Sequence, residues 1–378
     1  MLILGILIGL IVLVLLVSVH ELGHAIVARR NGVVVEEFGI GFPPRAWAKK
    51  LKNGILFSLN WLPIGGFVKL QGEHDAANKK GDYGAATFWQ KTKILLAGVA
   101  VNWIVAVLLL MVLAWTTGIP KIISNQFSVA SDTTIVASPV QLATLVEGYP
   151  AEKAGLEQGD VIQSIAGEKV NETVQFVDAT KEHRGETVPI VFERDGERKT
   201  TEVSLRDTET ATFGASLGQQ QTMKATWSAP ITAVATTGQF TWVTIEGLGS
   251  LVYNFFGGLF GQLSIDEGTR EHASEQLGEA GASVAGPVGI LGVIFPAASE
   301  AGPAQIVFLA AIISLTLAVM NTLPIPALDG GRWFVTALFR VLKKPLTKDR
   351  EERIHGTGFM ILLLLIAVIT VADVINLF

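Results

Sequence analysis

Two histidines and a glutamate lie inside one apolar segment near the start of the chain. His20 and His24 are four residues apart in VSVHELGHAIVARR, which directly follows the apolar run from Leu2 to Val17. On a helix, residues four apart lie on one face, so both imidazoles can bind one zinc ion while Glu21 acts on water. Ionisable groups at membrane depth are expensive and usually serve a function. Core histidines without a ligand are the alternative, but each would need its own polar partner.

A zinc ion held by two histidines needs a third protein ligand and keeps a fourth position for water. The chain has no cysteine, so this ligand must be His, Asp or Glu. We expect four further histidines to be surface residues in soluble loops: His74, His183, His272 and His355. The best candidate is Asp329 in MNTLPIPALDGGRW, where two prolines interrupt the end of an apolar segment. Its alternative role is the N-cap of a helix that starts at GGRW.

The composition indicates several transmembrane helices joined to a water-soluble part. Of 378 residues, 49% are hydrophobic and 17% are charged, and the mean hydropathy is +0.46. The net charge of −5 and the lack of a basic stripe argue against a nucleic-acid partner. The first apolar run has no preceding Lys or Arg and continues into HELGH, so we expect a retained helix and not a signal peptide.

We predict four transmembrane helices, over residues 1–30 with HExxH, 93–117, 304–340 with the LDG motif, and 357–378. Lys and Arg cluster after the first helix, before the second, and between the third and fourth, which predicts that these loops are cytoplasmic. The N- and C-termini are then extracytoplasmic. His20 and Asp329 both fall toward the cytoplasmic ends of their helices, which supports their pairing.

The segment between the second and third helices should lie outside the membrane. Residues 135–220 alternate short β-branched strands with turn signals, which predicts a β-rich α+β domain. Residues 221–303 form an extracytoplasmic amphipathic segment in this scheme. Within it, Gly238 to Leu263 is apolar enough for a fifth span, but a fifth span would reverse the third helix. We expect an interfacial helix there; a segment packed on the helix bundle is the alternative.

The cytoplasmic loop, residues 31–92, contains a predicted β-hairpin. GILFSLNWLPIGGFVKL, Gly54 to Leu70, has strand-like alternation and the pair Gly65–Gly66. Unpaired backbone groups are costly in lipid, so an extended segment at membrane depth needs a strand edge with which to pair. A membrane-associated hairpin would supply that edge; an ordinary cytoplasmic hairpin is the alternative.

HELGH in the first span, together with NTLPIPALDG in a later one, resembles the site-2 protease family of intramembrane zinc metalloproteases. The nearest likeness is to the bacterial regulator-of-sigma-E type, which carries PDZ domains between its second and third spans. FGIGFPPR, LPIGGFVKLQGE, AGVAVN and AGPVGI match the same pattern in order. Two departures, Val99 in place of proline and Phe67 in place of tyrosine, touch no expected ligand.

This resemblance implies zinc ligands, a catalytic base and polar groups near the metal. The ligands would be His20, His24 and Asp329, the base Glu21, and the groups that hold substrate or an oxyanion Asn102 and Asn321. The resemblance also implies that an unwound substrate helix pairs with the edge of the hairpin at Gly65 and Gly66. GYPAEKAGLEQGDVIQSIAGEKV resembles a PDZ domain, in which FGASLG, Phe213 to Gly218, would bind a peptide C-terminus. A steric role in excluding bulky substrates is equally compatible.

The sequence therefore predicts an α-helical membrane protein with an inserted PDZ domain, in the bacterial inner membrane. Its expected activity is zinc-dependent hydrolysis of peptide bonds in single-span membrane proteins, such as anti-sigma factors or signal-peptide remnants. A non-catalytic PDZ scaffold with a vestigial metal site, or a metal transporter, are the alternatives. The expected partners are the substrate, a peptide C-terminus at the PDZ domain, and the lipid bilayer.

Overall fold

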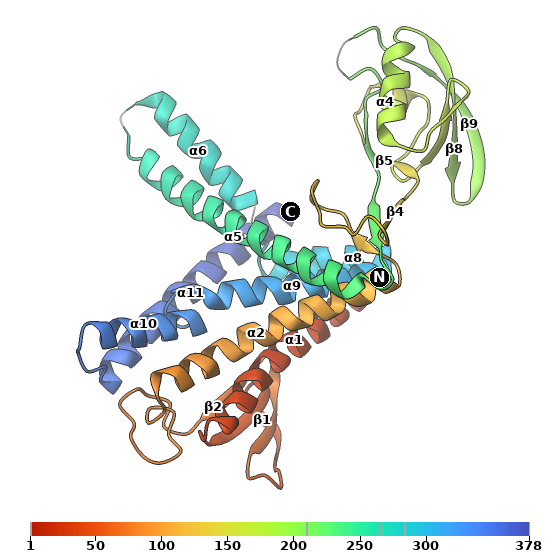
Figure 1. Ribbon diagram of the computed structural model, residues 1–378. Helices are drawn as coiled ribbons and strands as arrows, with labels where there is room; N and C mark the ends of the chain where they lie inside the picture. Colours follow the sequence, from red (N-terminus) through yellow and green to blue (C-terminus); the bar gives the residue numbers. More distant parts are fainter. Residues whose placement is uncertain (1, 209–210, 265, 283–284, 378) are drawn as a thin grey trace. The chain divides into compact units, whose positions relative to one another are not determined.

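The computed structural model describes residues 2–208, 211–264, 266–282 and 285–377. The chain forms two compact units, one of Met1–Leu113 with Pro230–Phe378 and the other of Ala114–Ala229. Figure 1 shows that the first unit is mainly helical and the second mainly β-stranded.

Four helices of the described chain are long and apolar enough to cross a membrane. They are α1 (Leu2–Arg30), α2 (Phe88–Trp115), α9 (Pro303–Thr322) and α11 (Lys348–Leu377). The predicted fold class, a four-span helical membrane protein with an inserted β-rich domain, is confirmed. The third long helix ends at Thr322, because Pro324 and Pro326 remove backbone donors and exclude helical backbone before them. The chain turns there and starts α10 (Asp329–Val341).

Small residues allow α1, α2 and α9 to pack closely, and Figure 1 shows them side by side. A Cβ at Gly23 of α1 would lie 2.9 Å from the carbonyl oxygen of Ala97 in α2. The hydroxyl of Ser314 in α9 donates to the carbonyl of Asn102 in α2 at 2.9 Å. Close backbone approach through small residues is typical of helix packing in membranes.

Strands β1 (Val35–Lys50) and β2 (Leu56–Leu70) are both bent and pair with each other twice. Residues 37–40 of β1 pair with residues 56–59 of β2 on one side and with residues 66–69 on the other. The two strands thus build a four-stranded antiparallel sheet, and the second half of β2 is one of its edges. Glu37, which is buried, accepts hydrogen bonds from Arg45 and Ser58 and ties the inner strands together.

The remaining helices of this unit are α5 (Ala229–Gly261), α6 (Glu267–Ala282), α7 (Pro287–Gly289), a π-helix (Ile290–Ile294) and α8 (Phe295–Ala301). The first half of α5 packs on the long helices: Trp103 donates to the hydroxyl of Thr241 at 3.2 Å, and Phe240 meets Phe308 edge to face. The second half exposes aromatic side chains, Tyr253 and Phe260 among them. Among the described residues, α5 does not qualify as a fifth membrane-spanning helix.

The β-rich unit holds two sheets. The larger has the order β10–β5–β6–β8–β9, with β7 beside β6, and the smaller has the order β3–β11–β4. The larger sheet and its helices are β5 (Val140–Leu145), α3 (Pro150–Lys153), β6 (Val161–Ile165), β7 (Glu168–Lys169), α4 (Thr173–Glu182), β8 (Thr187–Arg194), β9 (Glu197–Ser204) and β10 (Ala215–Gly218). The smaller sheet consists of β3 (Ile119–Pro120), β4 (Thr134–Ala137) and β11 (Gln221–Lys224).

The core of this unit follows from strand alternation. Val188, Ile190 and Phe192 of β8 are buried at every second position, so one face of the sheet is apolar. Helix α4 covers that core with Phe176, whose ring lies 4.9 Å from the ring of Phe213.

Candidate metal centre and active site

Three side chains from two distant parts of the sequence meet between α1 and the start of α10. Asp329 Oδ2 lies 3.1 Å from His20 Nε2 and 3.2 Å from His24 Nε2. The two Nε2 atoms are 3.1 Å apart. Both histidines are buried, each 6% exposed, and Asp329 is partly buried. Among the described residues, this trio is the group of His, Asp and Glu side chains able to hold a metal ion.

The spacing of these atoms fits zinc. Nitrogen and oxygen ligands about 2.0–2.1 Å from a tetrahedral zinc ion lie roughly 3.3 Å from one another. The observed separations of 3.1–3.2 Å are close to that value. Two imidazoles and one carboxylate are also a donor set typical of catalytic zinc, with one position left for water or substrate.

The ring of His24 is held in the orientation that a metal ligand needs. Its Nδ1–H donates to the carbonyl of Ile94 in α2 at 2.7 Å, which leaves Nε2 with a free lone pair. The Nδ1 atom of His20 is buried and has no hydrogen-bond partner within the described residues. Both rings thus turn Nε2 toward Asp329.

Helix α2 passes directly against the two imidazoles at Gly98. A Cβ at this position would lie 2.5 Å from His20 Cε1 and 2.6 Å from His20 Nε2, and closer still to His24 Nε2. Only glycine fits here. Sequence reasoning missed Gly98, whose signal was that α2 contains a single glycine.

The carboxylate of Glu21 is held by the sheet. Its Oε2 accepts a hydrogen bond from the backbone N–H of Val68 in β2 at 3.0 Å. Val68 lies in the second half of β2, which forms an edge of the sheet. The sequence could not indicate this contact, because a backbone donor leaves no signature in residue types.

Asp329 is the first residue of α10, and Leu328 takes the N-cap position. The interpretation of Asp329 as the helix N-cap is therefore wrong. Its carboxylate turns toward the histidines of α1, as the distances above show. The turn before it is tight, since a Cβ at Gly330 would lie 2.7 Å from the carbonyl oxygen of Leu323.

The other predicted site residues lie as follows. Asn102 is 1% exposed, and both polar atoms of its side chain lack partners among the described residues. It stands one turn beyond Gly98 on the same face of α2. Gly65 and Gly66 lie against α1, where a Cβ at Gly66 would be 3.6 Å from the hydroxyl of Ser18. Asn321 is partly buried in the last turn of α9.

His355 is not a loop residue, contrary to expectation. It lies in the second turn of α11 and is partly buried, because α11 already starts at Lys348.

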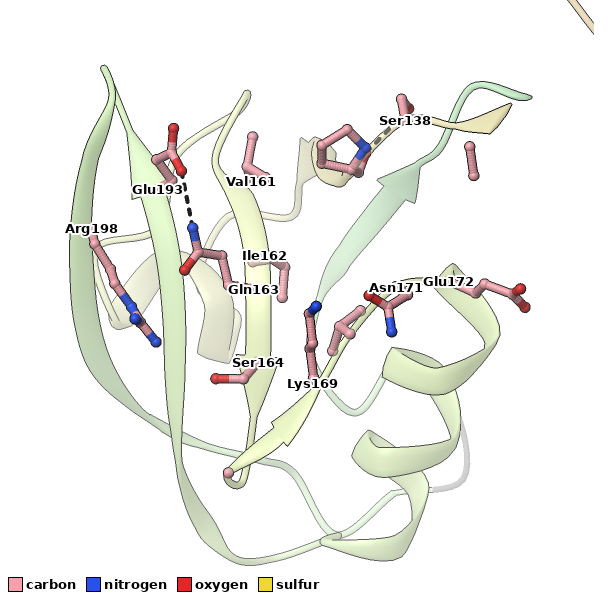
Figure 2. A pocket seen from close by; sticks show the side chains of 14 residues that line it. Ser138, Val161, Ile162, Gln163, Ser164, Lys169, Asn171, Glu172, Glu193 and Arg198 are labelled. Atoms are coloured by element: carbon pink, nitrogen blue, oxygen red, sulfur yellow. Dashed lines mark hydrogen bonds between the residues drawn. The ribbon is translucent and has the colours of Figure 1, made fainter. Parts of the chain in front are cut away.

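The β-rich unit has a cavity of about 840 Å³ beside β6 and the start of α4 (Figure 2). Gln163 and Glu193 are hydrogen-bonded in it at 3.0 Å, and Lys169 and Arg198 line it. It contains no part of the His20 cluster.

The chain matches the family model described as Peptidase family M50 over residues 8–365. It is 28% identical to the zinc metalloprotease RasP of Bacillus licheniformis, over 96% of this chain and 97% of the relative. It is 26% identical to the regulator of sigma-W protease RasP of Bacillus subtilis, over 96% of each chain.

A solved PDZ domain of an SdrC-like protein from Listeria monocytogenes, 21% identical, covers 24% of this chain and 93% of its own, with a TM-score of 0.19. The match to the family model spans nearly the whole sequence, including HELGH and LPIPALDG. The chain belongs to peptidase family M50, the site-2 protease family, and is a zinc metalloprotease of the membrane.

Proposed function

We propose that His20, His24 and Asp329 are the zinc ligands and that Glu21 is the catalytic base. The observation that carries this proposal is the convergence of three ligand atoms at mutual distances of 3.1–3.2 Å, with Glu21 next to one of them in sequence. When bound, zinc supplies a Lewis acid that polarises a carbonyl group and makes water nucleophilic near neutral pH.

Glu21 moves the protons of the reaction. Its Oε2 is held by the N–H of Val68, so its Oε1 takes the proton of the attacking water and later delivers it to the leaving amine nitrogen.

Asn102 stabilises the oxyanion that forms when water attacks the carbonyl group. Its side-chain amide is buried and unpartnered among the described residues, and a developing negative oxygen is the partner that such a donor stabilises best. Asn321 is assigned the same function from the family resemblance.

The substrate pairs with the edge of β2. Since N–H groups two residues apart point to the same side of a strand, Gly66 directs its backbone polar groups to the side on which Val68 meets Glu21. The absence of side chains at Gly65 and Gly66 lets a second backbone approach there. An unwound transmembrane segment would satisfy its own backbone groups on this edge.

The substrates are single-span membrane proteins, cut in or near their membrane segments. Anti-sigma factors already trimmed outside, and remnants of signal peptides, have this form. The relative in Bacillus subtilis is named for the regulation of sigma-W, which supports the first class. The alternative is a scaffold whose metal site is vestigial.

The active site opens toward the cytoplasm, with the hairpin of residues 31–92 on that side and both termini outside. The β-rich domain lies outside as a PDZ domain. Its strand β10 pairs only with β5 in the described sheet, so the other edge of β10 is available for a peptide C-terminus. A filter that excludes bulky substrates is the alternative role of this domain.

The test is proteolysis by the purified full-length protein in liposomes that contain a single-span substrate. We expect Glu21→Gln to lower the rate by at least about 100-fold while zinc stays bound, because glutamine cannot accept a proton. The scaffold alternative predicts no cleavage by either protein. A Glu21→Gln rate within about tenfold of the wild type would contradict the assignment of the base.

A further inference from the structure

The turn from Leu323 to Leu328 determines where Asp329 lies, and one of its residues is strained. Ala327 has φ +87°, a region that residues with a side chain seldom adopt. A residue in such a conformation persists only where its surroundings hold it. Two residues later the chain presents the carboxylate of Asp329 to His20 and His24. Whatever holds Ala327 therefore also determines the position of that carboxylate.

Helix α11 supplies the contact that holds this turn. The backbone N–H of Ala327 donates to Nδ1 of His355 at 3.3 Å. One turn further along α11, a Cβ at Gly358 would lie 2.5 Å from Cβ of Pro326, so the backbone of α11 lies directly against the turn. The histidine and the glycine thus fix two consecutive residues, Pro326 and Ala327, from the same helix.

The hydrogen bond also determines which nitrogen of His355 carries the proton. A backbone N–H can only donate, so Nδ1 is the acceptor and the neutral ring carries its hydrogen on Nε2. That Nε2 is buried, without a partner among the described residues, beside a cavity of about 370 Å³ that Asp329, Arg332 and Phe359 also line. His355 is not part of the group whose ligand atoms converge within 4.8 Å, so it is no candidate ligand itself.

We propose that His355 is a positioning residue for Asp329: through its Nδ1 it holds Ala327 at positive φ, and so holds the carboxylate in reach of the metal. This inference rests on the proposed zinc site. Residues that do not bind the metal but orient its ligands typically contribute a factor of 10 to 100 in metal affinity.

The test measures the affinity of the metal-free, full-length protein for Co²⁺. Binding is detected by the visible absorbance of the bound ion. His355→Leu removes the acceptor at similar volume, and we expect affinity to fall about tenfold. His355→Asn keeps an acceptor oxygen near the position of Nδ1, and we expect its affinity to stay within about threefold of the wild type. His272→Leu on α6, whose histidine is 71% exposed, controls for the loss of a histidine and should have no effect.

Two results would overturn the proposal: wild-type affinity in His355→Leu, or equal losses in His355→Leu and His355→Asn. If His355→Leu does not fold, the double variant with Ala327→Gly decides. Glycine adopts positive φ without strain, so folding and Co²⁺ affinity should recover in the double variant. Failure to recover would refute the proposal that His355 acts by holding residue 327 at positive φ.

An incorrect assignment of the zinc ligands would give a different result from an incorrect role of His355. In that case Asp329→Ala would bind Co²⁺ as tightly as the wild type, whatever residue stands at position 355.

Discussion

Replacing Gly98 with alanine tests the geometry of the metal centre through a residue that is no ligand. The added methyl group would lie 2.5 Å from His20 Cε1 and 2.6 Å from His20 Nε2. Carbon atoms in favourable contact lie about 3.5–4.0 Å apart, so the rings must retreat by roughly 1 Å.

The rings have little room to move. His24 is tethered to the carbonyl of Ile94 at 2.7 Å, and α1 and α2 are already in backbone contact at Gly23. Overpacking of this kind typically costs about 1–3 kcal/mol of stability. Ligand distances in metal sites tolerate only about 0.2 Å, so a shift of roughly 1 Å should abolish stoichiometric zinc binding. A misplacement of about 1 Å can cost 100-fold in rate, and we expect at least that loss of proteolysis.

The assay compares zinc content, initial rate and melting temperature of Gly98→Ala with those of Gly247→Ala. Gly247 lies in α5, and a Cβ added there would meet no atom within 4 Å, so its substitution should leave all three quantities near wild type. One zinc per chain in Gly98→Ala, with a rate within about tenfold of the wild type, would refute the description of the site as a close contact between α2 and the imidazoles.

Further predictions concern the β-rich unit and the topology. Burial opposes ionisation of Asp160, but hydrogen bonds from Arg194 and from the N–H of Glu157 outweigh it and hold the pKa of Asp160 below its ordinary value. Asp160 therefore stabilises the domain above about pH 4, and hydrogen exchange of β6 in the full chain should show that this contribution is lost as the pH falls below that value. Arg194→Met should destabilise the domain by about 3 kcal/mol by the same measurement, since it leaves a buried carboxylate without its cation; a loss below about 0.5 kcal/mol would contradict this. A cysteine at Lys169 should react with an impermeant thiol reagent in intact cells and one at Lys344 only after lysis, whereas the reverse pattern would refute the proposed orientation.

The sequence predicted that His20, His24 and Asp329 lie together, because part of this prediction depends only on local spacing. HExxH on a helix places His20 and His24 on one face wherever that helix lies. Asp329 followed because the third ligand had to come from another span at similar depth, where a carboxylate ends an apolar segment. The structure brings the three side chains together.

The contacts that position these three side chains could not be predicted from the sequence, because each contact joins segments far apart in the chain. The approach of Gly98 to the imidazoles and the hydrogen bond from Val68 to Glu21 depend on how α2 and β2 pack on α1. The double pairing of β1 with β2 depends on bends that alternation does not reveal. His355 looked like a loop histidine because the polar start of α11, KDREERIH, has no apolar periodicity.

Zinc coordination in the purified full-length protein tests the central claim most directly. Elemental analysis should show one zinc per chain, and X-ray absorption at the zinc edge should show two imidazoles and oxygen ligands at about 2.0–2.1 Å. The Asp329→Ala variant should fold with the same helix content and lose that zinc. A zinc environment without imidazole, or full zinc occupancy in a folded Asp329→Ala protein, would contradict the assignment of His20, His24 and Asp329 as its ligands.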